Sequence, residues 1–186
     1  MKFAHMIKLT NFFSPIRILL VLTLFISSII QGAETKVKLK FNTQNYSFFI
    51  SDLLLVKDMN VTDISAKIGN TKHVRERKNG EQAFFYDDLG ITVLAINGKL
   101  RGVTVTLNSD GDKNYVEKSY TGEFNFGKVS VSSKTVKSDF KKLDGFFVCG
   151  MPGLCGSKNK KAAIKVLAGF QTSGLSKITY LSFLFN

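Results

Sequence analysis

The sequence of 186 residues has few of the residues on which most enzyme sites depend. It contains two histidines, two cysteines, two prolines and no tryptophan. We expect His5 to be removed with an N-terminal leader, so a Ser-His-Asp or Cys-His site would depend on His73 alone. His73 stands in a charged segment, residues 72–78, of the kind that forms solvated loops or edge strands. We therefore expect no catalytic residue, and the protein is not predicted to be an enzyme.

A metal or cofactor site is not expected either. One remaining histidine and two cysteines that we expect to bridge each other cannot assemble a nitrogen–sulfur metal cage. The acidic pair Asp87-Asp88 is not a two-carboxylate acid/base device, because adjacent strand residues face opposite ways. We therefore predict no metal and no cofactor.

The sequence also has no hydrophobic run long enough to span a membrane. Residues 18–30 are almost entirely apolar and follow three basic residues and no acidic one. This run is shorter than the roughly 20 residues that a membrane span needs, and the arrangement is typical of a secretory signal peptide. We expect residues 1–33 to be a signal peptide cut after Ala33 and the mature protein to be periplasmic. An uncleaved N-terminal anchor is the alternative.

Acidic residues are outnumbered, and the chain carries a formal charge of +12. A basic protein can meet an anionic surface or an acidic partner. Basic and apolar residues alternate in residues 36–41, as in a strand with one wet face, and do not gather as in a nucleic-acid patch. The densest basic run, residues 158–161, is interpreted as a solvated loop, with an anion site as the alternative. An anionic surface therefore stays a possible partner, and nucleic acid is not expected.

The two cysteines are close in sequence. Cys149 and Cys155 enclose Gly-Met-Pro-Gly-Leu, and in an oxidising compartment such a pair is expected to form a disulfide. A redox-active pair is the alternative, but it typically has the spacing Cys-x-x-Cys at a helix N-terminus. We predict a structural disulfide that holds this loop.

Two segments are candidates for contact with a partner. A bridged apolar loop loses little conformational freedom on binding, although it could also fold onto its own domain. A tyrosine beside acidic residues resembles an interface hot spot, and the alternative is that the carboxylates bond to the following backbone amides. The candidate partner-binding residues are Tyr86, Asp87, Asp88, Phe147, Met151, Pro152 and Leu154.

Most of the remaining sequence has the alternation typical of β-strands. The apolar runs at residues 91–96 and 100–107 flank Asn97-Gly98, which is the strongest short signal for a hairpin. Residues 178–185 are apolar on both faces, so a central strand is predicted there.

Two short helices are expected, at residues 60–69 and 135–145, each with a capping residue and a terminal glycine. In both halves of the chain a hairpin precedes the helix and strands follow it. We therefore predict an internal duplication, with a first repeat at residues 34–108, a polar connector at 109–119, and a second repeat with the disulfide loop at 120–186. With the helices packed on one sheet face, the expected fold class is α+β.

The string Tyr86-Asp87-Asp88-Leu89-Gly90-Ile91, after a helix that ends in Lys67-Ile68-Gly69, carries a resemblance. It resembles the strand motif of a family of exported bacterial domains of uncharacterised function, some of which are associated with toxin–immunity loci. The resemblance covers about residues 46–145, and Asn70 replaces the proline usual after the helix glycine. The order of helix, glycine, strands and hairpin is also similar to that of SmpA/OmlA envelope lipoproteins and duplicated β-lactamase-inhibitor-like proteins. Such a resemblance implies a non-enzymatic binder.

These observations favour a periplasmic, non-catalytic protein-binding module. We expect an immunity or inhibitor protein that masks the active site of another envelope or exported protein, such as a toxin or hydrolase. The alternative is an envelope assembly or maintenance factor that binds outer-membrane components through a basic face.

Overall fold

The structure, a computed structural model, describes residues 37–186 except for residues 72, 144, 173 and 175. The expected signal peptide, residues 1–33, lies outside the described residues. In the part of the chain that is described, no helix is both long and apolar enough to cross a membrane.

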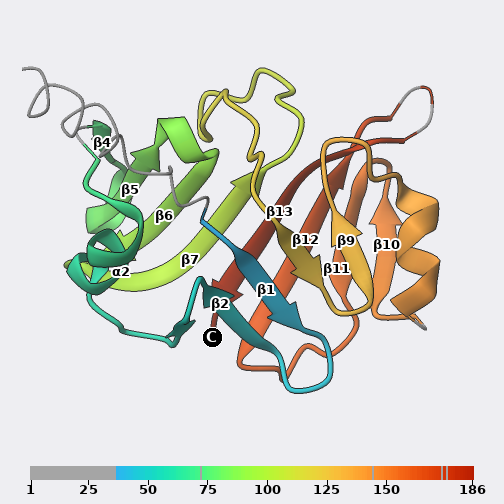
Figure 1. Ribbon diagram of the computed structural model, residues 1–186, viewed down its shortest axis with the longest axis horizontal. Coiled ribbons are helices and arrows are strands. Elements are labelled where there is room, and N and C mark those ends of the chain that lie inside the picture. The colour runs from blue at the N-terminus through green and yellow to red at the C-terminus, as the bar shows by residue number, and fades with distance from the viewer. Residues whose placement is uncertain (1–36, 72, 144, 173, 175) are drawn as a thin grey trace, which may run out of the picture. The chain divides into compact units, whose positions relative to one another are not determined.

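The larger of two sheets has eight strands in the spatial order β10-β11-β12-β13-β7-β6-β5-β4. Its strands are β4 (His73–Glu76), β5 (Glu81–Tyr86), β6 (Ile91–Ile96), β7 (Lys99–Thr106), β10 (Phe147–Met151), β11 (Leu154–Ser157), β12 (Ile164–Phe170) and β13 (Ile178–Phe185). Figure 1 shows the meander β4–β7 beside the meander β10–β13. They are joined where β13 pairs antiparallel with β7, with Leu181 opposite Val105. Strand β13 is therefore central, as its two-sided apolar pattern predicts.

The hairpin at Asn97-Gly98 is confirmed. Strands β6 and β7 pair antiparallel on either side of it. Asn97 and Gly98 both have positive φ, 52° and 70°, which is the conformation that a two-residue type I′ turn requires.

The smaller sheet has five strands in the order β3-β2-β1-β8-β9. Its strands are β1 (Leu39–Asn42), β2 (Ser47–Ile50), β3 (Leu53–Leu55), β8 (Phe124–Phe126) and β9 (Val129–Val131). Strand β1 pairs with β8 in parallel, with Leu39 opposite Phe124. The two sheets pack through phenylalanine rings: Phe48 of β2 stacks on Phe183 of β13 with 4.0 Å between centroids. Much of the chain's large phenylalanine content fills this core.

Helical structure is limited. Helix α2 (Val61–Ile68) is the only α-helix among the described residues. It ends before Gly69, as predicted, but the Asn60 side chain makes no cap bond to it. The second expected helix, at residues 135–145, is instead a 3₁₀ segment, η3 (Lys137–Leu143). Thr135 does not cap it, because its hydroxyl accepts the N–H of Ser132 at 2.9 Å. Two further 3₁₀ turns are η1 (Lys78–Gly80) and η2 (Asp87–Leu89).

The predicted α+β fold, with helices on one sheet face, is wrong. The fold is mostly β, and a second sheet provides the main layer over the large one. The internal repeats at residues 34–108 and 120–186 stay a prediction, and the two halves do not form separate sheets. Each sheet takes strands from both halves of the chain, through the pairs β1–β8 and β7–β13. These pairs give hydrogen-bond partners to backbone N–H and C=O groups that would otherwise be unpaired at strand edges.

Candidate functional site

The large sheet has an inner face, which packs on the small sheet, and an outer face. Phe183 points inward to Phe48, so Ser182 points outward. Residues directly opposite each other on neighbouring strands share a face. One outward row crosses all the strands of this sheet: Val148, Gly156, Leu167, Ser182, Thr104, Thr92, Phe85 and His73.

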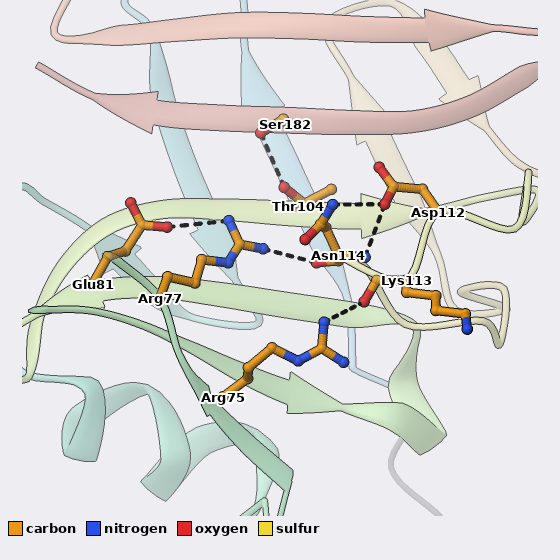
Figure 2. Close-up of polar contacts among 8 residues, drawn as sticks. All are labelled: Arg75, Arg77, Glu81, Thr104, Asp112, Lys113, Asn114 and Ser182. Carbon is orange, nitrogen blue, oxygen red and sulfur yellow. Dashed lines mark hydrogen bonds and ion pairs between the residues drawn. The ribbon is translucent and has the colours of Figure 1, made fainter. Parts of the chain in front are cut away.

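The β4 half of the outer face is covered by residues 109–119, the predicted connector, which we call the strap. Figure 2 shows how it is held: Arg75 Nη1 donates to the Lys113 carbonyl at 2.8 Å, and Arg77 Nη2 donates to the Asn114 carbonyl at 3.0 Å. The strap also contributes a buried side chain, Val116, which packs with Phe85 and its neighbours. The connector therefore forms part of the fold.

The strap is further ordered by its own turns. The Asp110 carboxylate accepts the Asp112 N–H at 3.1 Å, and the Asp112 carboxylate accepts the Asn114 N–H at 2.9 Å. These are Asx turns, a usual role of aspartate in loops. Across the described ranges, no group of three or more His, Cys, Asp or Glu residues is placed to hold a metal.

The centre of the outer face is polar and closed to solvent. Thr104 Oγ1 of β7 donates to Ser182 Oγ of β13 at 2.9 Å, where the two meanders join (Figure 2). Both residues are buried, as is Thr92. Within the described structure, the hydroxyls of Thr92 and Thr106 are buried without a hydrogen-bond partner. This centre therefore offers no polar group to a ligand in the present conformation.

The β10 half of the outer face carries partly or well exposed apolar side chains, and we call this surface the open patch. Val148 and Met151 of β10 are 57% and 61% exposed. Lys165 of β12 lies opposite Leu184 on the same face and adds a positive charge to its margin. The open patch consists of Val148, Met151, Leu154, Leu167, Tyr180 and Leu184.

Tyr180 lies at the boundary between the strap and the open patch. A Cβ added to Gly169 would lie 2.4 Å from Tyr180 Cε1, so the ring lies flat over a position that only glycine leaves free. The ring also contacts that of Tyr115 in the strap, with 5.3 Å between centroids. Burial raises the pKa of Tyr180, with a smaller contribution from Tyr115. The Tyr180 hydroxyl therefore stays protonated to higher pH than that of an exposed tyrosine.

The predicted disulfide is confirmed: Cys149 and Cys155 are bonded across the β10–β11 hairpin. The structure divides the candidate residues of this loop between two faces. Met151 and Leu154 pair with each other and lie on the open patch, with Pro152 exposed at the turn. Phe147 faces inward, where its ring stacks on Phe126.

The second predicted segment lies in the other half of the sheet. Tyr86 is 4% exposed, its hydroxyl hydrogen-bonds with Ser65 Oγ at 2.8 Å, and burial raises its pKa. Tyr86 therefore contributes to the core and not to a surface. The acidic pair is exposed, and each carboxylate has a local partner. Asp87 lies 3.3 Å from His73 Nδ1, and Asp88 lies 3.1 Å from Lys118 Nζ of the strap.

Sequence reasoning missed four members of the open patch: Val148, Leu167, Tyr180 and Leu184. For Tyr180 and Leu184 the signal was present, because strand β13 carries apolar residues on both faces. That pattern predicts burial on both faces. The sequence alone does not show that one of those faces lacks a covering layer.

Residues 40–141, more than half of the sequence, match the model of a family described as a domain of unknown function, DUF7738. The chain belongs to this family. The matched segment includes the small sheet, the meander β4–β7 and the strap, whereas strands β10–β13 follow it.

No curated protein matches the chain. Two solved structures have a distant likeness. An extracellular protein containing an SCP domain, from Bacillus anthracis str. Ames, is 8% identical, with 69% of this chain and 44% of that one covered and a TM-score of 0.41. A cysteine-rich secretory protein from Staphylococcus aureus subsp. aureus Mu50 is 13% identical, with 69% and 43% covered and a TM-score of 0.36. The chain spans less than half the length of either structure, and neither likeness carries an argument about function.

Proposed function

We propose that the chain is an exported, non-catalytic binding module that docks on another protein through the open patch. The observation that carries this proposal is the exposure of Val148 and Met151, at 57% and 61%, beside four further apolar side chains on one sheet face. Contiguous exposed apolar surface on a soluble domain marks an interaction site more often than scattered apolar residues do.

The backbone beneath the patch favours binding. Residues of the patch lie on paired strands, and the disulfide between Cys149 and Cys155 joins the two outermost. A surface that is already ordered loses little conformational entropy when a partner docks, so more of the contact energy appears as affinity.

The partner that fits this surface has an apolar centre and an acidic margin. Lys165 lies on the same face as Leu184, and the whole chain carries a formal charge of +12. Complementary charge around an apolar contact speeds association and selects the partner. An exported toxin or hydrolase whose active site is masked by this face fits the description, and the chain would then be its immunity or inhibitor protein.

Export to the periplasm is part of the same proposal. The disulfide is of the kind that persists in oxidising compartments. The N-terminal residues have the composition of a signal peptide.

An envelope assembly factor is the alternative. It is favoured by the exposed lysines of residues 158–161, since clustered cations attract anionic lipid head groups. This function would place the contact on the basic loop and leave the open patch without a role in binding.

The test compares two valines on the two edge strands of the same sheet. Val148→Asp alters the open patch on β10, and Val74→Asp on β4 is the matched control, because Val74 is also exposed, at 44%. We expect the mature wild-type protein to capture one stoichiometric protein from a periplasmic extract. Calorimetry with that purified partner should show about 30-fold weaker binding for Val148→Asp, the effect of losing a hot spot, and none for Val74→Asp.

Two results would contradict the proposal. One is equal binding by both variants. The other is recovery of lipid or outer-membrane protein in place of a single partner. A gene for an exported toxin beside this one would favour the immunity role among protein-binding functions.

A further inference from the structure

A groove lies on the inner side of the same hairpin, between η3 and the β10 end of the large sheet. It has a volume of about 590 Å³, within the range of roughly 300–1,000 Å³ typical of ligand pockets. Three phenylalanine rings and the disulfide line it: Phe140 of η3, Phe147 of β10, Phe170 of β12, Cys149 and Cys155. The groove therefore has an apolar lining of ligand size.

Two lysines stand at the margin of this groove. Lys137 and Lys141 both come from η3 and line it, and both are exposed. Lys137 Nζ lies 6.0 Å from the centroid of the Phe170 ring, so a cation stands directly beside the apolar lining. A ligand in the groove would meet phenylalanine rings in its lining and positive charge at its margin.

The described structure provides no acid to neutralise these lysines. None of the described residues that line the groove is acidic, and neither lysine takes part in an ion pair between described residues. The acid on η3, Asp139, is used locally, because its carboxylate accepts the Val136 N–H at 2.9 Å. Among the described residues, Lys137 and Lys141 are thus the charged groups that a ligand in the groove would meet.

We propose that this groove binds a single-chain amphiphilic anion, with the acyl chain among the rings and the carboxylate or phosphate head at Lys137 and Lys141. A peptide fits less well. The lining is mainly rings and sulfur, and backbone amides buried there would lose hydrogen bonds to water without replacement. An acyl chain has no such groups and gains from burial of each methylene.

This site does not depend on the proposed protein-binding function. The groove and the open patch lie on opposite faces of the β10–β11 hairpin, so Val148→Asp leaves the groove lining unchanged. Failure of either proposal can therefore be recognised separately.

The test uses purified mature protein and monomeric ligands below their micelle concentrations, measured by calorimetry. Octanoate, decanoate and dodecanoate should bind with affinity that rises about fourfold per methylene. Decanol and decyltrimethylammonium have the same chain with a neutral or a cationic head, and both should bind more weakly than decanoate.

Two variants locate the site. Replacing both groove lysines, Lys137→Gln with Lys141→Gln, should weaken decanoate binding about five- to tenfold and leave decanol unchanged. The matched control, Lys160→Gln with Lys161→Gln, removes the same charge from the exposed basic loop and should have no effect. Ser138→Trp, an exposed groove position, should fill the groove and abolish binding of every chain.

The proposal is overturned by any of three results. These are equal binding of decanoate and decyltrimethylammonium, an equal effect of the two lysine pairs, or binding to phosphatidylglycerol vesicles with none to the monomeric acids. Unchanged melting temperatures would establish that each variant is folded.

Discussion

The ring of Tyr115 lies against the ring of Tyr180, with 5.3 Å between their centroids. This contact joins the strap to the central strand of the large sheet. On one side of it the outer face is covered by the strap, and on the other side the face carries the open patch. The area of the proposed binding surface therefore depends on the strap, which covers the rest of the outer face as long as it stays attached.

Weakening the attachment of the strap should expose more of the outer face. Arg77→Gln removes the hydrogen bond to the Asn114 carbonyl and the ion pair with Glu81. We expect faster amide hydrogen exchange in residues 112–118 and increased binding of a hydrophobic dye. Arg101→Gln is the control, because Arg101 pairs with Asp58 and not with the strap. Equal exchange in the two variants would contradict this role for Arg77.

Replacing threonine by valine at two buried positions in the centre of the sheet should change the free energy of unfolding in opposite directions. Thr104→Val leaves Ser182 without its partner and should lower the free energy of unfolding by about 1–3 kcal/mol. Thr92→Val removes a buried hydroxyl that lacks a partner among the described residues, and should raise it by about 1 kcal/mol. Urea titrations measure both.

A double variant completes this series. Thr104→Val with Ser182→Ala removes both partners and should restore most of the stability lost in Thr104→Val. Destabilisation that simply adds across the two sites would mean that the hydroxyl pair is not a coupled unit.

Removing the disulfide should destabilise the protein moderately. Cys149 and Cys155 are 6 residues apart, and closing so short a loop in the unfolded chain is worth about 2 kcal/mol. Replacing both cysteines by alanine should lower the midpoint of urea unfolding in oxidising buffer. Wild-type protein in reducing buffer should resemble the variant. An unchanged midpoint would show that the bond does not contribute to stability.

Alkaline pH should destabilise the fold. Burial raises the pKa of Tyr86, Tyr115 and Tyr180 above the ordinary value of 10.0. Above about pH 10 the unfolded chain releases tyrosine protons that the folded chain still holds, so the free energy of unfolding falls as pH rises towards the raised values. Below pH 10 these groups add no pH dependence.

Thermal unfolding at pH 8 and pH 11 measures this effect. Tyr180→Phe keeps the ring over Gly169 and removes one titrating hydroxyl. Its melting temperature should therefore fall less between pH 8 and pH 11 than that of the wild type. Equal losses would exclude a contribution from Tyr180.

The local elements could be predicted from the sequence. Asn97-Gly98 defines its hairpin through the backbone conformation that these residues tolerate, and Gly69 ends helix α2 with a positive φ of 91°. In place of the helix expected at residues 135–145 the 3₁₀ segment η3 forms, and the side chain of Thr135 bonds to the preceding turn. A capping residue in the sequence does not reveal which of its neighbours it will bond.

The candidate site was less predictable, because it depends on which surfaces other segments cover. The polar composition of residues 109–119 indicates a connector, but not that Arg75 and Arg77 hold it over the sheet. Likewise, the apolar residues Leu167 and Leu184 look like core residues in sequence. Their exposure follows from the absence of a second strap over the β10 half of the described structure.

The junction of strands β7 and β13 has a consequence for how the protein folds. Thr104 and Ser182 meet across that junction although 78 positions separate them in the chain, whereas each meander is built from neighbouring hairpins. Distant contacts form slowly because a long loop must close first. Until it does, the two half-sheets each present an unpaired edge to other chains. Association during refolding should therefore depend on protein concentration, with the joining of the half-sheets as the slow step.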